Sequence, residues 1–234
     1  MFCILPFEVD FYKKWGTQVD YVGNPLLDAV AAFKPNKVFL ANNNLSEKKI
    51  IALLPGSRRQ EISRLLPEMI RASQKFPGYQ FVIAGAPSFN RNYYEQFFDG
   101  KSIPVLFNAT YDLLSHAEGA VVASGTAILE TALFNVPQVL VYKGHPISIG
   151  IARALIKIKY IGLVNLIMDS TVIKELIQQY CTPENITAEL DNILNNKTYR
   201  ENMLANYDKL DEKMGKPGAS AKTAELIIKY ASKK

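Results

Sequence analysis

A regular alternation between short apolar runs and helix-forming segments, between residues 49 and 142, most constrains the fold of this chain. Five runs are apolar along nearly their whole length and are expected as strands: 49–54, 79–84, 105–107, 119–123 and 138–142. Between them, helices are expected at 60–76, 93–98, 110–116 and 127–134. Strands that are apolar on both faces and alternate with helices are typical of a parallel sheet covered on both sides. We therefore predict an α/β fold with a Rossmann-like, doubly wound parallel sheet.

The region before this pattern is less regular. Residues 3–5 and 19–22 are expected as two short strands, and residues 8–15 as one or two helical turns. Neither strand has an obvious local partner in the sequence.

The region after the sheet becomes entirely helical beyond Pro183. Three apolar stripes recur there at helical spacing, and Pro217-Gly218 separates the last two helices. We therefore expect one domain over residues 25–182 and a C-terminal helical extension over residues 183–234.

Composition is that of an ordinary globular protein, with 48% hydrophobic and 21% charged residues. The formal net charge of +5 favours anionic partners without choosing among phosphates, nucleic acid and acidic lipid. No run of basic residues is interleaved with aromatic ones, so a nucleic-acid partner is not expected.

Cysteine and histidine are too sparse for a disulfide framework or a metal site. Cys3 and Cys181 lie far apart, which favours free thiols in a reducing compartment. His116 and His145 are the only histidines, and neither CxxC nor HExxH spacing occurs. We expect no metal and no cofactor.

No secretory signal or membrane span is expected. The N-terminus lacks a basic region followed by an apolar core. The longest apolar stretch, 147–166, is interrupted by Arg153, Lys157 and Lys159 and falls short of the ~20 apolar residues that a span needs. Residues 147–160 fit either contact with anionic lipid head groups or an ordinary helix with a basic outer face. The chain is expected to be soluble or peripheral to a membrane.

The first turn with the chemistry of a binding site is Pro55-Gly56-Ser57-Arg58, directly after an apolar strand. Gly56 lets the backbone approach a ligand closely, and Ser57 suits a helix N-cap. The amides of a helix start favour an anion, and Arg58 can hold phosphate with two hydrogen bonds. An ordinary strand-to-helix turn with solvated arginines explains the same residues.

A second turn of this kind runs from Ser124 through Gly125 to Thr126, with Glu130 one helical turn further on. Its small residues leave helix amides open, and a carboxylate at this place can accept both hydroxyls of a ribose. Glu130 fits equally well as a glutamate that complements the helix dipole.

The two turns are expected to share a ligand. Ligands of open α/β sheets bind outside the carboxyl ends of the strands, and both turns follow such ends. We therefore predict that Gly56 and Gly125 face a single cleft that binds a nucleoside diphosphate.

Four segments, taken in order, make the sequence similar to a known family. They are Val-Gly-Asn-Pro-Leu-Leu-Asp at 22–28, Leu-Leu-Pro-Gly-Ser-Arg at 53–58 followed by Glu61, Val-Ala-Ser-Gly-Thr-Ala at 122–127 followed by Leu129-Glu130, and Lys-Glu-Leu-Ile-Gln at 174–178 preceded by Asn165. They resemble the signature segments of the lipid-A-disaccharide synthases, and the resemblance runs over nearly the whole chain.

This resemblance implies one half of a GT-B architecture, in which two Rossmann-like halves enclose the active site and the C-terminal half binds the UDP-sugar donor. Carried over by position, the diphosphate is held by Gly56, Ser57, Arg58, Ser124, Gly125 and Thr126. Glu130 then binds the ribose, and Asn165 and Gln178 line the donor pocket. Arg58 also stabilises the leaving UDP, and no other catalytic residue is expected in this chain.

The family's reaction joins UDP-2,3-diacylglucosamine to 2,3-diacylglucosamine 1-phosphate (lipid X), forms a β-1,6 disaccharide and releases UDP without a metal. The resemblance also implies a cytoplasmic location, peripheral to the inner membrane, and suggests a homodimer formed through the C-terminal helices.

The chain departs from the family at three points. Leu163-Val164-Asn165 stands where Leu-Pro-Asn is usual, and Met168-Asp169-Ser170-Thr171 stands where a small-and-basic segment is usual. The acceptor-binding half, which carries the family's catalytic acidic residue and the general base, has no counterpart, so residues 1–24 are expected to be the end of that half and a linker. The chain alone is then expected to bind UDP without transferring sugar.

Two other functions remain open at this point. The chain fits a stand-alone UDP-sugar-binding subunit, and it fits another GT-B-like enzyme such as a UDP-N-acetylglucosamine 2-epimerase. His116 is expected to be structural, and the sequence does not assign roles to Tyr142, Lys143 or His145.

Overall fold

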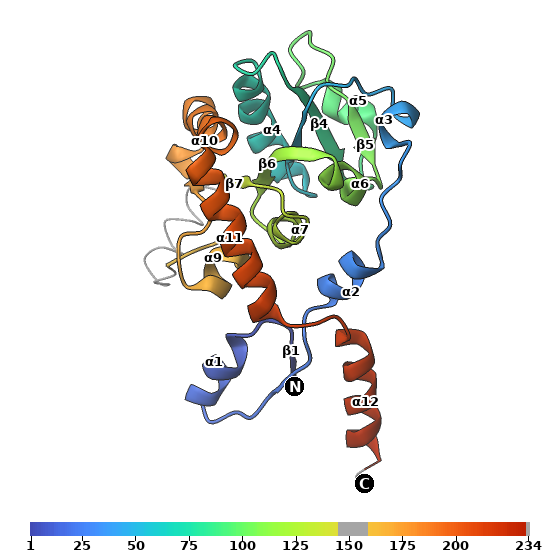
Figure 1. Ribbon diagram of the computed structural model, residues 1–234, viewed down its shortest axis with the longest axis vertical. Coiled ribbons are helices and arrows are strands. Elements are labelled where there is room, and N and C mark those ends of the chain that lie inside the picture. The colour runs from blue at the N-terminus through green and yellow to red at the C-terminus, as the bar shows by residue number, and fades with distance from the viewer. Residues whose placement is uncertain (145–158, 233–234) are drawn as a thin grey trace.

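The computed structural model describes residues 1–144 and 159–232, and its centre is a six-stranded sheet (Figure 1). All neighbouring strands are parallel, and their spatial order is β5-β4-β3-β6-β7-β8. The strands are β3 (Ile50–Leu54), β4 (Gln80–Gly85), β5 (Val105–Phe107), β6 (Ala117–Ala123), β7 (Gln138–Tyr142) and β8 (Glu175–Ile177). The central strands are buried on both faces, which explains why they are apolar throughout.

The order of the strands contains one reversal, which determines where a ligand can bind. The chain moves from β3 outward to β4 and β5, and then crosses back to β6 on the other side of β3. Right-handed crossovers in opposite directions place their helices on opposite faces of a sheet. The helices of the two directions are α4 (Arg59–Ser73) with α5 (Arg91–Glu95), and α6 (Thr110–Ser115) with α7 (Ala127–Leu133). A crevice is expected between β3 and β6, where the direction changes.

The sequence from Leu163 to Met214 completes the sheet domain. It forms α9 (Leu163–Met168), β8, the 3-10 helix η1 (Gln178–Tyr180), α10 (Pro183–Asn195) and α11 (Lys197–Met214). Thr182 caps α10 ahead of a proline at the first helical position, and Asn196 caps α11. Helix α10 packs beside α4 and against β6 and β7, so the first part of the predicted helical extension closes the core of the sheet domain.

The two ends of the chain form a smaller lobe, at the bottom of Figure 1. Strands β1 (Phe2–Cys3) and β2 (Asp20–Tyr21) pair with each other in parallel, and α1 (Glu8–Lys14) lies between them in sequence. The last helix, α12 (Ala219–Ala231), extends away from the sheet domain and contacts α2 (Pro25–Ala32). A short helix, α3 (Phe39–Asn42), follows α2.

Residues 23–28 join this lobe to the sheet domain, and we call them the joint. The Asn24 side chain accepts the amide of Leu26 at 3.0 Å and donates to the carbonyl of Ile4. The carboxylate of Asp28 accepts the amides of Gly218 and Ser220, the latter at 3.1 Å. These amide hydrogen bonds lower the pKa of Asp28. Asp28, the last residue of a motif that the sequence offered as a family signature, therefore accepts the amides at the start of α12, whose N-cap Gly218 lies 190 positions further along the chain.

Much of the predicted secondary structure is confirmed. The five apolar runs are strands of one parallel sheet, which confirms the doubly wound α/β class, and the predicted helices between them are present with boundaries shifted by a few residues. Among the described residues, three α-helices, one 3-10 helix and one strand were not predicted: α2, α3, α9, η1 and β8. The prediction for residues 147–160 lies almost entirely outside the described residues, as does His145.

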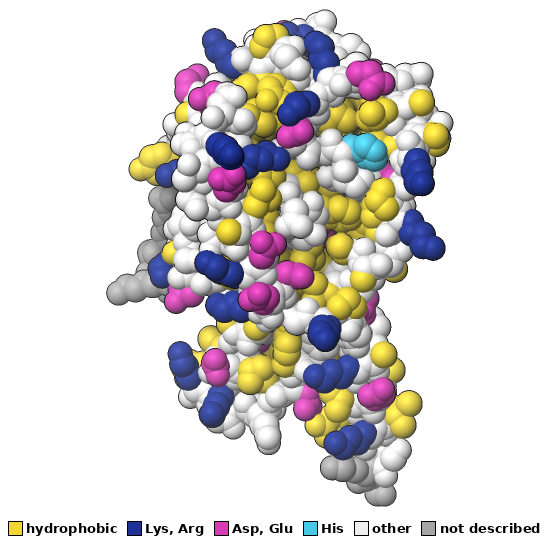
Figure 2. Space-filling model, viewed as in Figure 1, with side chains coloured by type: hydrophobic (Ala, Val, Ile, Leu, Met, Phe, Trp, Pro, Cys, Tyr) yellow, Lys and Arg dark blue, Asp and Glu magenta, His cyan; other side chains and the backbone are white. Residues whose placement is uncertain are grey.

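The structure adds two findings about the ends of the chain. The two N-terminal strands do have a partner, because they pair with each other. The apolar stripe of the last helix does not enter a core, since Ile227 and Ile228 are 54% and 67% exposed. Figure 2 shows such apolar side chains on the surface of the lobe, mixed with lysines and arginines. In the described part of the chain, no helix has the length and apolar character that crossing a bilayer requires.

Candidate functional site

A cleft of about 480 Å³ opens at the carboxyl ends of β3, β4 and β6, where the strand order reverses. Seven of the residues predicted for the site line it: Gly56, Ser57, Arg58, Ser124, Gly125, Thr126 and Glu130. The two turns therefore face one cleft, as their positions after parallel strands predict. The end of β4 and the loop after it form a third wall, with Gly85, Ala86 and Pro87.

The first turn is held by a glutamate from within the chain. Glu61 Oε2 accepts the amides of Ser57 and Arg58, both at 3.1 Å, and Glu61 Oε1 lies 2.7 Å from Nη1 of Arg58. Gly56 has φ +99°, a backbone conformation that favours glycine. Arg58, and not Ser57, is the N-cap of α4, which corrects the sequence-based assignment.

The second turn leaves its backbone donors open. The Ser124 amide donates to the carbonyl of Val141 at 3.1 Å and so continues the sheet. Among the described residues, no group accepts a hydrogen bond from the amides of residues 125–128. A Cβ added to Gly125 would meet nothing within 4 Å, so the turn is open to the cleft. This turn has the backbone donors that an anion requires.

Glu130 projects into the cleft from the first turn of α7. Its Oε1 accepts the hydroxyl of Tyr111 at 2.9 Å, which fixes the carboxylate against α6. Burial, followed by the hydrogen bond to Glu130 and the charge of its carboxylate, raises the pKa of Tyr111. A neutral tyrosine therefore orients the carboxylate, whose second oxygen no described residue engages.

Asn165 does not reach the cleft. Its side chain is fully buried, and Oδ1 accepts the amides of Val172 and Ile173 at 2.8 and 3.0 Å. Its Nδ2 donates to the Ile173 carbonyl and to Glu175, both at 2.9 Å. All four hydrogen-bonding positions of the amide are used inside the protein. The structure thus gives Asn165 a structural role in place of the predicted contact with the donor.

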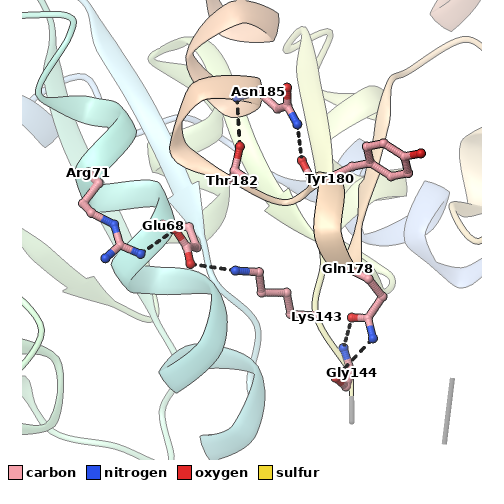
Figure 3. A network of polar contacts seen from close by, with 8 residues as sticks. All are labelled: Glu68, Arg71, Lys143, Gly144, Gln178, Tyr180, Thr182 and Asn185. Atoms are coloured by element: carbon pink, nitrogen blue, oxygen red, sulfur yellow. Dashed lines mark hydrogen bonds and ion pairs between the residues drawn. The ribbon is translucent and has the colours of Figure 1, made fainter. Parts of the chain in front are cut away.

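Gln178 also lies apart from the lining of the cleft, in the network drawn in Figure 3. It follows β8 with φ +55°, and its Oε1 accepts the amide of Gly144 at 2.9 Å. Nearby, Lys143 Nζ lies 2.6 Å from Glu68 Oε1, and Arg71 binds the other oxygen of Glu68 at 2.5 Å. These contacts hold the chain that leaves β7 against α4 and the end of β8.

The remaining candidates are structural. His116 Nδ1 donates to the Asp112 carbonyl, 2.8 Å away, and the His116 ring lies 5.0 Å from that of Phe39. Cys3 and Cys181 are free and buried, and burial raises the pKa of the Cys181 thiol to about 11. Within residues 1–144 and 159–232, no group of three or more acidic, histidine or cysteine side chains is arranged to hold a metal ion.

Sequence reasoning missed Tyr111 and the loop after β4, and it gave Glu61 no role. Glu61 stands three positions after Arg58, the spacing of a capping box, but the sequence placed the N-cap at Ser57, four positions before Glu61, and so concealed this signal. No local signal marks Tyr111, because its partner Glu130 lies 19 positions further along.

A comparison of the sequence with known families identifies the family of this chain. The sequence model described as lipid-A-disaccharide synthetase matches residues 1–228, a span that contains both turns and the joint. The chain belongs to this family.

Curated members of the family are similar along the whole chain. The lipid-A-disaccharide synthase of Syntrophus aciditrophicus is 37% identical over 241 residues, and that of Myxococcus xanthus is 36% identical over 235 residues. These alignments cover 100% and 97% of this chain but 63% and 61% of the relatives. The chain therefore spans about three fifths of the length of the curated relatives that it matches.

Solved structures share the fold at low sequence identity. The UDP-GlcNAc 2-epimerase of Neisseria meningitidis, in a structure bound to UDP-GlcNAc, has a TM-score of 0.58 with 14% identity over 97% of this chain and 61% of the epimerase. The calicheamicin glycosyltransferase has a TM-score of 0.57 with 16% identity over 99% of this chain and 52% of its own. The fold of this chain thus corresponds to somewhat more than half of each of these two larger enzymes.

Proposed function

We propose that the cleft binds the UDP moiety of a nucleotide sugar, and that the chain supplies the donor site of a lipid-A-disaccharide synthase. In this reaction, 2,3-diacylglucosamine passes from UDP to 2,3-diacylglucosamine 1-phosphate. The observation that carries the proposal is the convergence of two strand-to-helix turns and Glu130 on one cleft, in a chain of this family. The shared fold of an epimerase bound to UDP-GlcNAc adds support.

Each part of UDP has a partner of matching chemistry in the proposed arrangement. The open amides of the second turn and the guanidinium of Arg58 take the diphosphate. The free oxygen of Glu130 accepts from the ribose hydroxyls. The same donors stabilise the negative charge that develops on UDP as the glycosidic bond breaks, so Arg58 assists the leaving group.

The proposal extends to where the protein works. Both proposed substrates carry acyl chains, so we place the reaction at the inner membrane, with the protein peripheral to its cytoplasmic side. The exposed apolar side chains of α12 suit the further proposal of a homodimer formed through the C-terminal helices.

Calorimetry with the full 234-residue chain tests the proposal. The wild type is expected to bind UDP. Arg58→Ala should weaken UDP binding about 10- to 100-fold, the effect of losing hydrogen bonds to a charged group, and should leave uridine binding unchanged. Glu130→Ala should weaken UDP and uridine alike, because the ribose is common to both.

Arg91→Ala is the matched control, since Arg91 pairs with Glu95 on α5 outside the cleft lining. A folded wild type that binds no UDP, or an Arg58→Ala variant that binds UDP as the wild type does, contradicts the donor-site proposal.

A further inference from the structure

Gly56 makes room for a side chain of the protein itself. A Cβ added at this position would lie 2.5 Å from Glu61 Oε2 and 2.9 Å from the Glu61 Cβ, closer than atoms can pack. The glycine with its φ of +99° therefore brings the turn onto Glu61. Glycine in such a turn usually allows the backbone to approach a ligand closely. Here the group that the backbone approaches is a carboxylate of the same chain.

The amides of the first turn are consequently occupied. Ser57 and Arg58 both direct their N–H groups at one oxygen of Glu61, and the other oxygen pairs with the Arg58 guanidinium at 2.7 Å. A phosphate oxygen at these amides would have to displace a carboxylate held by three hydrogen bonds. The amides of the second turn are open, so the two turns are chemically unlike although they face the same cleft.

Arg58 keeps most of its hydrogen-bonding capacity. A guanidinium has five N–H donors, and the described residues engage Nη1 alone. The side chain is 81% exposed at the mouth of the cleft, so its remaining donors are accessible to a ligand. Free arginine side chains lose rotamer entropy when they bind, and a contact that already fixes the guanidinium reduces this cost.

From this geometry we infer that Glu61 is a positioning residue. It fills the amide site of the first turn and holds Arg58 at the mouth of the cleft. The diphosphate is then met on this side by the guanidinium, and not by the Ser57 and Arg58 amides. The inference rests on the proposed donor site and adds to it the means by which the arginine is oriented.

A double-mutant cycle between Glu61 and Arg58 tests this inference, with UDP and uridine titrated into the full chain. Glu61→Ala should weaken UDP binding about tenfold, in line with the loss of a charge-assisted hydrogen bond, while uridine binding stays within about twofold of the wild type. In the Arg58→Ala background the same substitution should change UDP affinity by less than about twofold. Glu61→Gln keeps an acceptor for the amides but loses the ion pair, and should lie between the wild type and Glu61→Ala.

The controls separate positioning from folding. Glu61→Gln preserves the shape of the turn if Glu61→Ala unfolds it, and thermal melting of every variant reports the fold. Glu95→Ala removes an arginine partner on α5, outside the cleft lining, and should not change UDP affinity.

Each other result overturns the inference. Equal or tighter UDP binding by folded Glu61→Gln or Glu61→Ala would show that the carboxylate competes with the phosphates. If Glu61→Ala weakened UDP binding in the Arg58→Ala background as much as it does in the wild type, Glu61 would act through the amides of Ser57 and Arg58. A wild type that binds no UDP would overturn the proposed function together with this inference, whereas the first two results leave that function standing.

Discussion

One asparagine side chain holds together the loop that leads into β8. Asn165 accepts two backbone amides and donates to a carbonyl and a carboxylate, all within 3.0 Å. Buried backbone groups that lose their partners cost about 1–3 kcal/mol each. Asn165 therefore contributes to the stability of the fold and not to the lining of the cleft.

We expect Asn165→Ala to lower the free energy of unfolding by about 2–4 kcal/mol, because several buried groups lose their partner at once. Urea denaturation measures this loss. UDP affinity per folded molecule should stay unchanged. Asn165→Asp retains the acceptor oxygens and should lose less stability. A stable Asn165→Ala protein with weakened UDP binding would restore the role in ligand binding that the sequence predicted.

The site residues that could be predicted from sequence share one property: their geometry is set locally. Gly56 and Gly125 follow apolar strands, and parallel strands bring such ends to one edge. Asp28 could not be assigned this way, because its partner amides lie 190 and 192 positions further along the chain. The partners of Asn165 lie only 7 to 10 positions away, but they belong to the irregular loop before β8 and the start of that strand, where no repeating pattern in the sequence predicts the course of the chain.

At the scale of elements, α4 begins at the cleft and also forms an ion pair with the residue that follows β7. Glu68 in its middle accepts from Lys143, which follows β7, and from Arg71 on the next turn (Figure 3). Burial raises the pKa of Glu68, but the hydrogen bonds and charges of Lys143 and Arg71 outweigh burial, and the net pKa is lowered. The ionised form is thus favoured in the folded protein.

This shift predicts a pH dependence of stability. A lowered pKa contributes stability above the ordinary value of 4.5, and this contribution is lost as the pH falls through the folded-state pKa. Glu68→Gln should cost about 1–2 kcal/mol at pH 7, less than a fully buried pair because Lys143 is partly exposed. The difference from the wild type should shrink below pH 4.5.

Urea denaturation at pH 7, 5 and 3.5 measures the dependence. Glu95→Gln breaks an exposed pair with Arg91 and should cost no more than about 0.5 kcal/mol at any of these pH values. A Glu68→Gln deficit that stays constant with pH would show that the ion pair is not its source.

Elements were predictable where the apolar pattern is long, and missed where it is short. Helix α4 buries a full stripe of residues, and its periodicity identified it. Strand β8 has three residues of which one is buried, too few for any period to emerge. Helix α12 shows an apolar stripe but buries Ala219 alone, so amphipathic spacing did not imply a core.

At the scale of the molecule, the described part of the chain forms a sheet domain and a lobe that meet at the joint. The lobe combines both ends of the chain: Tyr230 of α12 donates to Asp20 at 2.8 Å, and its ring lies 6.3 Å from that of Phe2. Gly23 lies against Ala219, because a Cβ added to Gly23 would lie 3.5 Å from the Cβ of Ala219. Few contacts therefore determine where α12 lies.

Asp28→Ala should release α12 from α2. The first amides of the helix lose their cap, and we expect the amides of residues 219–231 to exchange with solvent about tenfold faster. Hydrogen exchange measured by mass spectrometry follows this segment separately from α4 and α10, whose protection should be unchanged. Asp211→Ala, which removes an acidic side chain from α11, is the control. Unchanged exchange across 219–231 in Asp28→Ala would mean that other contacts hold the helix.

The joint also determines where this protein tolerates added sequence. The first strand and the last helix are fastened to the same few residues, although Asp28 and Gly218 are 190 positions apart. An insertion within residues 23–28 would disturb both ends of the polypeptide at once. An insertion in the turn between α4 and β4, where a Cβ added to Gly78 would meet nothing within 4 Å, would leave both ends in place.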